Sequence, residues 1–431
     1  MAKFSPEFFI GAATAAHQVE GNNIHSDCWA MEQMKYTSYT EPSLDAVDHY
    51  NRYEEDIRLL AEAGLNAYRF SIEWARIEPE EGKFDEDQIE HYRGVIRCCK
   101  ENGVEPLVTL HHFSSPKWLI CKGGWESDET VDLFARYTRY VAEQLGKELH
   151  YVCTINEANM GIQVAAIMER YKRQMMAMAA RAEAGGAAEG QVQVGMNLQQ
   201  MMENQKLAAL ENQEVFGTPQ PQNFTSARTP HGDEIVQNAH RAARAVLREV
   251  CPWVKVGLSL SLHDIQAAEG GKERAAKEWE DEFTHYLPAI EGDDFLGVQN
   301  YTRSIIGPDG IQPVPEGAEM TQMDYEFYPQ ALEHVIRAAA KDFHGKLIVT
   351  ENGIATADDS RRVAFIDEAL AGVERCLKDG LPVKGYFHWS LLDNFEWQKG
   401  YSMTFGLIAV DRATQTRHPK ESLYFLGSRR S

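Results

Sequence analysis

Short apolar runs alternate with amphipathic segments along almost the whole chain. The runs have strand length and are rich in β-branched residues, whereas the segments between them repeat their apolar positions with the period of a helix. The predicted strands are Phe8–Ala13, Ala67–Phe70, Glu105–Leu110, Tyr151–Asn156, Lys255–Leu260, Phe295–Gln299, Leu347–Thr350 and Val383–Phe387. The predicted helices include Tyr50–Ala63, Asp87–Asn102, Thr130–Gly146, Asp233–Val250, Tyr328–Lys341 and Ser360–Asp379. Eight strands that alternate with helices predict an α/β fold built as a (β/α)8 TIM barrel with extended loops after the strands.

No linker or repeat interrupts this pattern, so residues 1–431 are predicted to form a single domain. A barrel of this kind often exceeds 400 residues when its loops carry insertions. The segment from about 160 to 229 is atypical, because it holds eight of the fourteen methionines and a glycine-containing patch, Ala182–Ala188. We expect helices interrupted at the glycines, inserted after the fourth strand.

Two glutamates stand at the ends of predicted strands. Glu157 follows the fourth strand in Thr154–Glu157, and Glu351 follows the seventh in Val349–Gly353. Catalytic residues of a (β/α)8 barrel lie at the C-terminal ends of its strands. Two carboxyls that converge across the barrel mouth form the pair that glycoside hydrolysis requires, one as acid and base and one as nucleophile. Arg69, at the end of the second strand, is the cation expected to keep one carboxyl ionised.

A run of aromatic residues interspersed with acids follows the last predicted strand. Trp389, Glu396 and Trp397 belong to this run. Aromatic faces stack on the C–H faces of a pyranose while carboxylates hold its hydroxyls, so the run favours a sugar pocket. A purely structural aromatic cluster accounts less well for Glu396, because a buried carboxylate without partners is costly.

The bulk composition excludes several partners. The formal net charge is −22, which argues against nucleic acids and anionic membranes. No run approaches the roughly 18 apolar residues of a membrane helix, and the first residues lack the pattern of a signal peptide. The seven cysteines are scattered and form no Cys-x-x-Cys motif, which is typical of reduced thiols. We therefore expect a cytoplasmic protein, and a homo-oligomer is compatible with the sequence.

An ordered set of motifs over nearly the whole chain resembles glycoside hydrolase family 1, the β-glucosidase and β-galactosidase family. The set is far more specific than a lone Glu-Asn-Gly would be. The matching segments are Phe9–Gly21, His49–Asp56, Tyr68–Ile72, Val108–His112, Asn156–Glu157, Thr350–Gly353 and Trp389–Tyr401.

The resemblance implies a retaining mechanism through a covalent glycosyl-enzyme, without a metal or cofactor. Glu157 matches the acid/base and Glu351 the nucleophile; Tyr301 and Arg69 match the residues that contact the nucleophile. Asn156 matches the amide that holds the sugar 2-hydroxyl. The residues that match the sugar pocket are Gln18, His112, Trp389, Glu396 and Trp397.

The resemblance also separates this chain from two groups of relatives. Members that act on 6-phosphorylated sugars carry serine, lysine and tyrosine around the phosphate, and here those places hold Trp397, Met403 and Phe405. Thioglucosidases have glutamine at the acid/base position, where this chain has Glu157. The expected substrate is therefore an unphosphorylated O-glycoside or oligosaccharide: a β-glucoside first, with β-galactosides and β-fucosides as additional substrates.

Three departures from the family pattern fall on the leaving-group side. Ala158 replaces the usual proline after the acid/base, Phe113 replaces a tryptophan, and Tyr325 stands where a tryptophan platform is usual. The methionine-rich segment belongs to the same region. It has two interpretations: helix packing, or an adaptable apolar wall for the non-sugar part of the substrate.

Three alternative functions remain open from the sequence. A transglycosylase would pass the sugar to an alcohol. A non-catalytic glycoside-binding protein would use the same pocket without turnover, although it would be expected to have lost part of the catalytic set. A metal-dependent hydrolase could use His111 and His112, but no third ligand with suitable spacing is evident.

Overall fold

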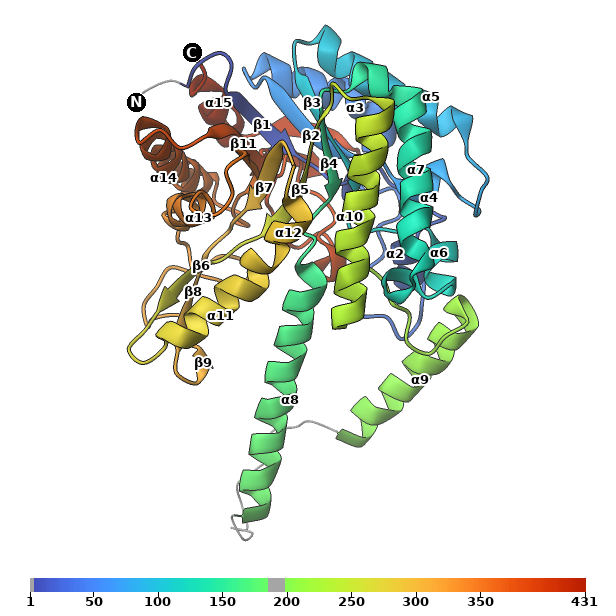
Figure 1. The fold of residues 1–431 in the computed structure, drawn as a ribbon, viewed down its shortest axis with the longest axis vertical. Helices are drawn as coiled ribbons and strands as arrows, with labels where there is room; N and C mark the ends of the chain where they lie inside the picture. The colour runs from blue at the N-terminus through green and yellow to red at the C-terminus, as the bar shows by residue number, and fades with distance from the viewer. Residues whose placement is uncertain (1–3, 185–197) are drawn as a thin grey trace.

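The computed structural model describes residues 4–184 and 198–431. At its centre, eight parallel strands form a closed barrel in the order β1-β2-β3-β4-β5-β7-β10-β11, and β11 pairs with β1 (Figure 1). The strands are β1 (Phe9–Ala13), β2 (Ala67–Ser71), β3 (Glu105–His111), β4 (Tyr151–Ile155), β5 (Lys255–Ser261), β7 (Phe295–Gln299), β10 (Lys346–Asn352) and β11 (Val383–Trp389). All eight predicted strands are present, with ends within two residues of those expected, and the barrel prediction is confirmed.

The helices that follow the strands cover the outside of the barrel (Figure 1). Those that correspond to predicted helices are α3 (His49–Glu62), α5 (Glu86–Glu101), α7 (Glu129–Leu145), α10 (Pro230–Val250), α13 (Ala331–Ala339) and α14 (Asp359–Lys378). Further helices are α1 (Ala16–Val19), α2 (Asp27–Glu32), α4 (Trp74–Ile77), α6 (Lys117–Cys121), α11 (Lys272–Glu282), α12 (Leu287–Ile290) and α15 (Glu421–Ser428).

Two predicted helices have wrong starting points, and a proline explains each difference. α10 begins three residues earlier than expected, because Thr229 accepts a hydrogen bond from the Gly232 amide and Pro230 occupies the first helical position. α13 begins three residues later than expected. Tyr328 precedes Pro329, and a residue before proline is disfavoured in the helical conformation.

Alternation along the strands separates two apolar layers. In β2, Ala67 packs in a narrow cluster inside the barrel, whereas Tyr68 and Phe70 pack in the larger layer between strands and helices. Arg69 has the same parity as Ala67, so its side chain lies inside the barrel above the apolar floor. Apolar side chains therefore fill the lower part of the barrel interior, and polar side chains such as Arg69 lie toward its mouth.

Two small sheets lie outside the barrel, and the sequence pattern did not predict them. One consists of β6 (Asp264–Ala267), β8 (Arg303–Gly307) and β9 (Gly310–Ile311), and it forms in the loops after β5 and β7. The other is the hairpin β12 (Ile408–Asp411) and β13 (Thr416–Pro419). Strands this short carry too few positions for a period of two to be recognised.

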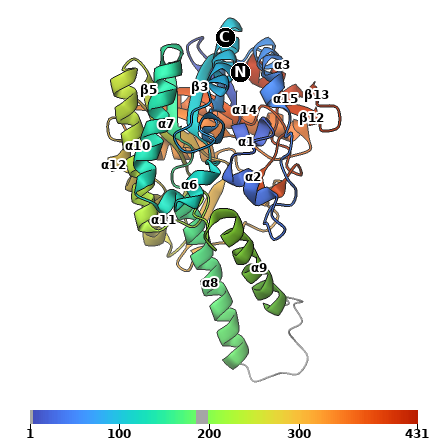
Figure 2. The same ribbon diagram turned by 90° about the vertical axis from the view of Figure 1, so that its right-hand side faces the viewer.

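The methionine-rich segment forms two helices, as predicted for the part that is described. α8 (Met160–Ala184) and α9 (Leu198–Phe216) extend away from the mouth of the barrel (Figures 1 and 2). Most of the glycine-containing patch and Met196 lie outside the described residues. In the described part of the chain, no helix is both long enough and apolar enough to cross a membrane. The assignment of the whole chain to one domain stays a prediction.

A buried ion pair joins α3 to the β12–β13 hairpin. Arg417 donates to the two carboxylate oxygens of Asp56 at 2.7 and 2.9 Å, and His49 Nδ1 lies 2.7 Å from the same carboxyl. Burial raises the pKa of Asp56, but the bonds from Arg417 and His49 outweigh burial and hold it below its usual value. The charged pair therefore stabilises the folded state at neutral pH.

Asp56→Asn should lower the free energy of unfolding by about 3–5 kcal/mol at pH 7, because it leaves a buried arginine without its counter-charge. Since the folded pKa of Asp56 is depressed, its contribution is present above the unfolded pKa of about 3.9 and is lost as the pH falls through the folded value. Denaturant unfolding at several pH values measures both effects. The control is Arg97→Met, which removes an exposed pair with Glu101 and should change stability little. Equal losses in the two variants would contradict the prediction.

Candidate active site

A cavity of about 510 Å3 opens at the C-terminal ends of the barrel strands. Arg69 lies directly beneath it, fully buried. Every other site residue expected from the sequence lines the cavity: Gln18, His112, Asn156, Glu157, Tyr301, Tyr325, Glu351, Trp389, Glu396, Trp397 and Phe405. The structure thus brings together residues that are up to 387 positions apart in the chain.

Glu351 is held by three donors. Its Oε1 accepts hydrogen bonds from Arg69 Nη1 at 2.5 Å and from Gln299 Nε2 at 3.0 Å. Its Oε2 accepts one from the Tyr301 hydroxyl at 2.6 Å. Burial raises the pKa of Glu351, while the charge of Arg69 and these hydrogen bonds oppose the rise. A carboxylate that accepts hydrogen bonds from three donors is ionised more readily than a neighbouring carboxyl that accepts none.

A register shift in β10 turns Glu351 into the cavity. Ile348 packs inside the barrel and Val349 outside it, so strict alternation would place residue 351 outside with Val349. The pairing with β7 shifts between Val349 and Glu351, which opposes Gln299. A bulge of this kind redirects a side chain next to a site, and here it lets Glu351 and Gln299 meet.

Glu157 has a different environment from Glu351. Its backbone has a φ of 44°, a left-handed conformation that is uncommon outside glycine and is often found at functional sites. Its amide donates to Ser259 Oγ at 3.1 Å, but no side chain in residues 4–184 or 198–431 donates a hydrogen bond to its carboxyl. Burial, followed by the charge of Glu351, raises the pKa of Glu157 well above the usual value. Of the two carboxyls, Glu157 therefore keeps the proton and Glu351 the negative charge.

Asn156 lies at the centre of the hydrogen bonds beneath the cavity. Its Oδ1 accepts from Arg69 Nη2 and Gln299 Nε2, both at 2.6 Å, and from Ser259 Oγ at 3.1 Å. Its Nδ2 lies 3.1 Å from His112 Nε2. The donors fix the amide so that its nitrogen faces the cavity side, where His112 lies.

Sequence reasoning gave no role to Ser259 or Gln299, although both hold this network. Ser259 interrupts the apolar strand β5 at a buried position, and a polar residue with inward parity near the C-terminal end of a barrel strand is a usable signal. The bond from Ser259 to Asn156 makes it part of the support for the site.

Aromatic rings form one wall of the cavity. His112 stacks on Trp389 with ring centres 5.6 Å apart, and Trp397 stacks on His17 at 5.7 Å. Burial and the charge of Arg69 lower the pKa of His112 well below its usual value, so its ring is neutral. A neutral ring can donate or accept a hydrogen bond without adding charge to the cavity.

Three buried polar atoms that line the cavity have no partner among the described residues: Gln18 Oε1, His112 Nδ1 and the Tyr325 hydroxyl. Buried polar groups in folded proteins are nearly always hydrogen-bonded, so such atoms indicate the place of a polar ligand or water. Gln18 Nε2 also donates to Glu396 Oε2 at 3.3 Å. Several hydroxyl groups on one small molecule would satisfy this set.

Glu396 is a third carboxyl in the cavity. Its removal from bulk water and the nearby charge of Glu351 raise its pKa to about 8. No lysine or arginine lines the cavity in the described part of the chain, His263 in its lining is paired with Glu282, and Arg69 lies beneath it. The cavity therefore favours neutral ligands that can donate hydrogen bonds to carboxyl oxygens.

The leaving-group side shows how the family departures are accommodated. The Ala158 amide donates to the Ser259 carbonyl at 3.0 Å, a bond that the proline usual in the family cannot make. Phe113 packs against Trp397 with ring centres 5.3 Å apart, and it supplies no donor. Met160 and Val164 line the cavity, whereas Met168 and Met176 are exposed. Among the described side chains of α8, those of the first turns therefore support the apolar-wall interpretation, and the exposed Met168 and Met176 do not.

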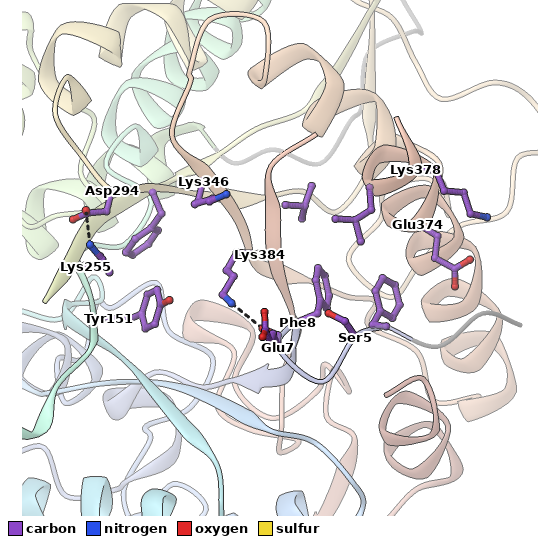
Figure 3. Close-up of a pocket in the computed structure, with 14 residues that line it drawn as sticks. Ser5, Glu7, Phe8, Tyr151, Lys255, Asp294, Lys346, Glu374, Lys378 and Lys384 are labelled. Atoms are coloured by element: carbon purple, nitrogen blue, oxygen red, sulfur yellow. Dashed lines mark hydrogen bonds and ion pairs between the residues drawn. The ribbon is translucent and has the colours of Figure 1, made fainter. Parts of the chain in front are cut away.

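A larger hollow of about 840 Å3 lies at the other end of the barrel, among the first residues of its strands (Figure 3). The carboxylates of Asp294 and Glu374 in it are bound to arginines: Asp294 to Arg248 at 2.7 Å and Glu374 to Arg429 at 2.8 Å. The bonds from the Val256 amide and Arg248 outweigh burial and lower the pKa of Asp294. Asp294 is therefore a poor proton donor, and the carboxyls with raised pKa values, Glu157 and Glu351, lie at the opposite end.

The histidine pair considered as a metal site has other partners. His111 Nε2 lies 3.0 Å from Ser115 Oγ, whereas His112 Nε2 faces Asn156. Within the ranges that the structure describes, no group of three or more His, Cys, Asp or Glu side chains is placed to hold a metal ion.

A family model described as glycosyl hydrolase family 1 matches residues 1–184 and 293–429. The chain belongs to glycosyl hydrolase family 1. This family 1 enzyme is a retaining β-glycosidase that hydrolyses O-glycosides, which confirms the resemblance and the function expected from the sequence. Neither transglycosylation nor binding without turnover gains support from the match. Residues 185–292, which include α9, β6 and α11, lie outside it.

Relatives of the family 1 enzyme cover almost its whole length. It is 29% identical to a 1,4-beta-D-glucan glucohydrolase of Thermotoga neapolitana, over 99% of this chain and 97% of the relative. It is 28% identical to a 6-phospho-beta-galactosidase of Staphylococcus haemolyticus, over 99% of this chain and 98% of the relative. The crystal structure of beta-glycosidase BGL167 has a TM-score of 0.86 and 44% identity, over 99% of this chain and 96% of that one.

Glu351→Gln should lower the pKa of Glu157, because it removes the negative charge that, after burial, contributes most to the rise. An NMR titration of carboxyl-labelled glutamate measures the shift. The control is Glu249→Gln, a change on the exposed face of α10 that should leave the titration of Glu157 as it is. An unchanged Glu157 pKa in the Glu351→Gln variant would show that the two carboxyls do not interact.

Proposed function

We propose that this family 1 enzyme hydrolyses terminal non-reducing β-D-glucosyl residues, with Glu157 as acid/base and Glu351 as nucleophile. The observation that carries the assignment is the unequal bonding of the two carboxyls. Glu351 has three donors from Arg69, Gln299 and Tyr301, whereas Glu157 has a raised pKa and no described side-chain donor. The first can stay ionised and attack, and the second can hold a proton and release it.

In the first step, Glu351 attacks the anomeric carbon while Glu157 gives its proton to the departing oxygen. The C–O bond to the leaving group breaks, a glycosyl–Glu351 ester forms, and the alcohol leaves. Burial continues to raise the pKa of Glu157, but the next largest cause of the rise disappears when the negative charge of Glu351 is consumed. Glu157 is then a better base at the moment when its role reverses.

In the second step, Glu157 removes a proton from water, and the water oxygen attacks the anomeric carbon. The ester to Glu351 breaks and the sugar is released with the configuration it had in the substrate, since each step inverts the centre once. Arg69 and Tyr301 stabilise the carboxylate as it departs. Asn156 is oriented to bind the 2-hydroxyl, a contact that strengthens in the transition state.

The proposed preference for an uncharged sugar follows from the charges of the residues that line the cavity. Gln18 Nε2 donates to Glu396 Oε2 at 3.3 Å, which supports the proposal that the two side chains hold adjacent hydroxyls. A carboxyl that bridges two hydroxyls tolerates a change at one of them. β-Galactosides and β-fucosides are therefore proposed as additional substrates. Although relatives include a 6-phospho-beta-galactosidase, Met403 and Phe405 offer no charge to a phosphate, and Glu396 would repel it when ionised.

We further propose that the enzyme acts in the cytoplasm on small β-glycosides or oligosaccharides, without nucleic acid or membrane partners. The net charge of −22 and the buried or unpaired cysteines support this environment. A homo-oligomer stays a proposal that a solution mass measurement would test.

Transfer to an alcohol is the second candidate, because Met160 and Val164 give the cavity mouth an apolar side where an acceptor could rest. Product analysis with added alcohol separates the two activities. Free sugar as the main product at high alcohol concentration would support hydrolysis, and alkyl glycoside would support transfer.

Glu351→Ala should lower kcat for 4-nitrophenyl β-glucoside by on the order of 10⁴-fold or more, as loss of a nucleophile does in other hydrolases. Added azide should restore part of the rate and give the α-glucosyl azide, since azide enters from the vacated side. In Glu157→Ala, azide should instead replace water in the second step and give the β-glucosyl azide. The control is Glu249→Ala on the surface, with near-normal rates expected. A β-glucosyl azide from Glu351→Ala and an α-glucosyl azide from Glu157→Ala would reverse the two assignments.

A panel of 4-nitrophenyl glycosides tests the sugar preference. We expect the highest kcat/KM for the β-glucoside, lower values for β-galactoside and β-fucoside, and no measurable turnover of the α-glucoside or the 6-phospho-β-glucoside. Fast hydrolysis of the phosphorylated substrate would show that the reading of Trp397, Met403 and Phe405 is wrong.

A further inference from the structure

A second hollow of about 220 Å3 lies beside the catalytic cavity. Its walls come from α8, α11 and the β6-β8-β9 sheet, which Figure 1 shows next to one another. We call it the isoleucine pocket after five of its lining residues: Ile162, Ile167, Ile265, Ile306 and Ile311. Isoleucine is stiff at χ1, so a pocket lined in this way keeps its shape when it is empty.

His263 connects this pocket to the catalytic cavity, because it lines both. Its Nδ1 and its amide bond to the two carboxylate oxygens of Glu282 at 2.8 and 2.9 Å, which hold the ring in place. α8 runs along both hollows: Met160 and Val164 line the catalytic cavity, and Ile162 lines the isoleucine pocket. A substrate that extends out of the catalytic cavity past His263 therefore meets the isoleucine pocket next.

The charges around the pocket are compensated. Glu282 is paired with His263, whose pKa is raised chiefly by the Glu282 charge. Glu278 lies 4.0 Å from Arg170, and Asp281 lies 2.8 Å from the ammonium of Lys277 on the same helix. No uncompensated charge on these acids remains to select an ionic ligand, and isoleucine is the commonest residue in the lining.

Two features indicate an apolar ligand of moderate size. Ile167 and Ile311 are 56% and 46% exposed, although they face a hollow beside an active site, while Ile306 is fully buried within it. An apolar cavity of about 150 Å3 is large enough to bind benzene. The isoleucine pocket exceeds that volume, so an aryl ring or several methylene groups fit.

We propose that the isoleucine pocket binds the far, uncharged apolar end of the aglycone of a β-glucoside, such as an alkyl chain that passes His263. The inference rests on the proposed function, since it assumes that the sugar occupies the catalytic cavity. β6, α11 and His263 lie outside the residues that the family model matches, whereas four of the five isoleucines lie inside them.

Calorimetric binding of octyl and methyl β-thioglucosides, below the micelle concentration, tests the pocket without requiring turnover. Each methylene that enters the pocket should tighten binding by about fourfold. The wild-type ratio of Kd for methyl to Kd for octyl should therefore be at least about tenfold. In the double variant Ile167→Asn with Ile311→Asn, which changes exposed positions, this ratio should fall by at least about fivefold. The control is Ile24→Asn, an isoleucine that is 55% exposed and lines neither hollow.

Hydrolysis of the matching O-glucosides, measured in the same proteins, separates the two proposals. The chain-length preference should appear in KM and be lost in the double variant. If the thioglucosides bind as expected and no glucoside is hydrolysed, the proposed function fails and the pocket assignment stands. If wild type shows no preference for octyl, or the double variant keeps the preference, the pocket assignment is overturned.

Discussion

The planar fork of Arg69 is the constraint on which the active site depends. One nitrogen of the guanidinium binds Glu351 at 2.5 Å and another binds Asn156 at 2.6 Å, so one rigid group fixes the acidic and the amide side of the cavity together. A fully buried arginine is tolerated only when an opposite charge compensates it, and Glu351 supplies this counter-charge. The negative charge that retaining hydrolysis needs on a nucleophile thus also offsets the buried charge of Arg69.

The difference between the two glutamates follows from this arrangement. Because the available donors converge on Glu351, Glu157 is left with burial and like charges, which favour its protonated form. A covalent bond to Glu351 would remove the main charge acting on Glu157 and prepare it to act as a base. One static arrangement can therefore serve both steps of a double displacement without a conformational change.

The sequence was sufficient for the barrel and for most of the site, because strand periodicity, strand-end carboxylates and ordered motifs are local signals. It was insufficient where the position of a side chain depends on pairing. Strict alternation gives the wrong face for Glu351, and only the register shift against Gln299 corrects it. Ser259 acts through a partner 103 positions away in the chain, which no local pattern shows. The isoleucine pocket depends on short strands whose pairing could not be recognised in advance.

We propose that the sugar is bound in the polar cavity and the far end of the leaving group in the isoleucine pocket beside it. The central proposal, that Glu351 carries the sugar between the two steps, is tested most directly by trapping the intermediate. A 2-deoxy-2-fluoro-β-glucosyl fluoride should inactivate the enzyme, because the ring fluorine slows both steps while the fluoride leaving group speeds the first. Peptide mass spectrometry should then find one fluoroglucosyl group on Glu351. A label on Glu157, or steady turnover with inversion of configuration and no label, would contradict the account.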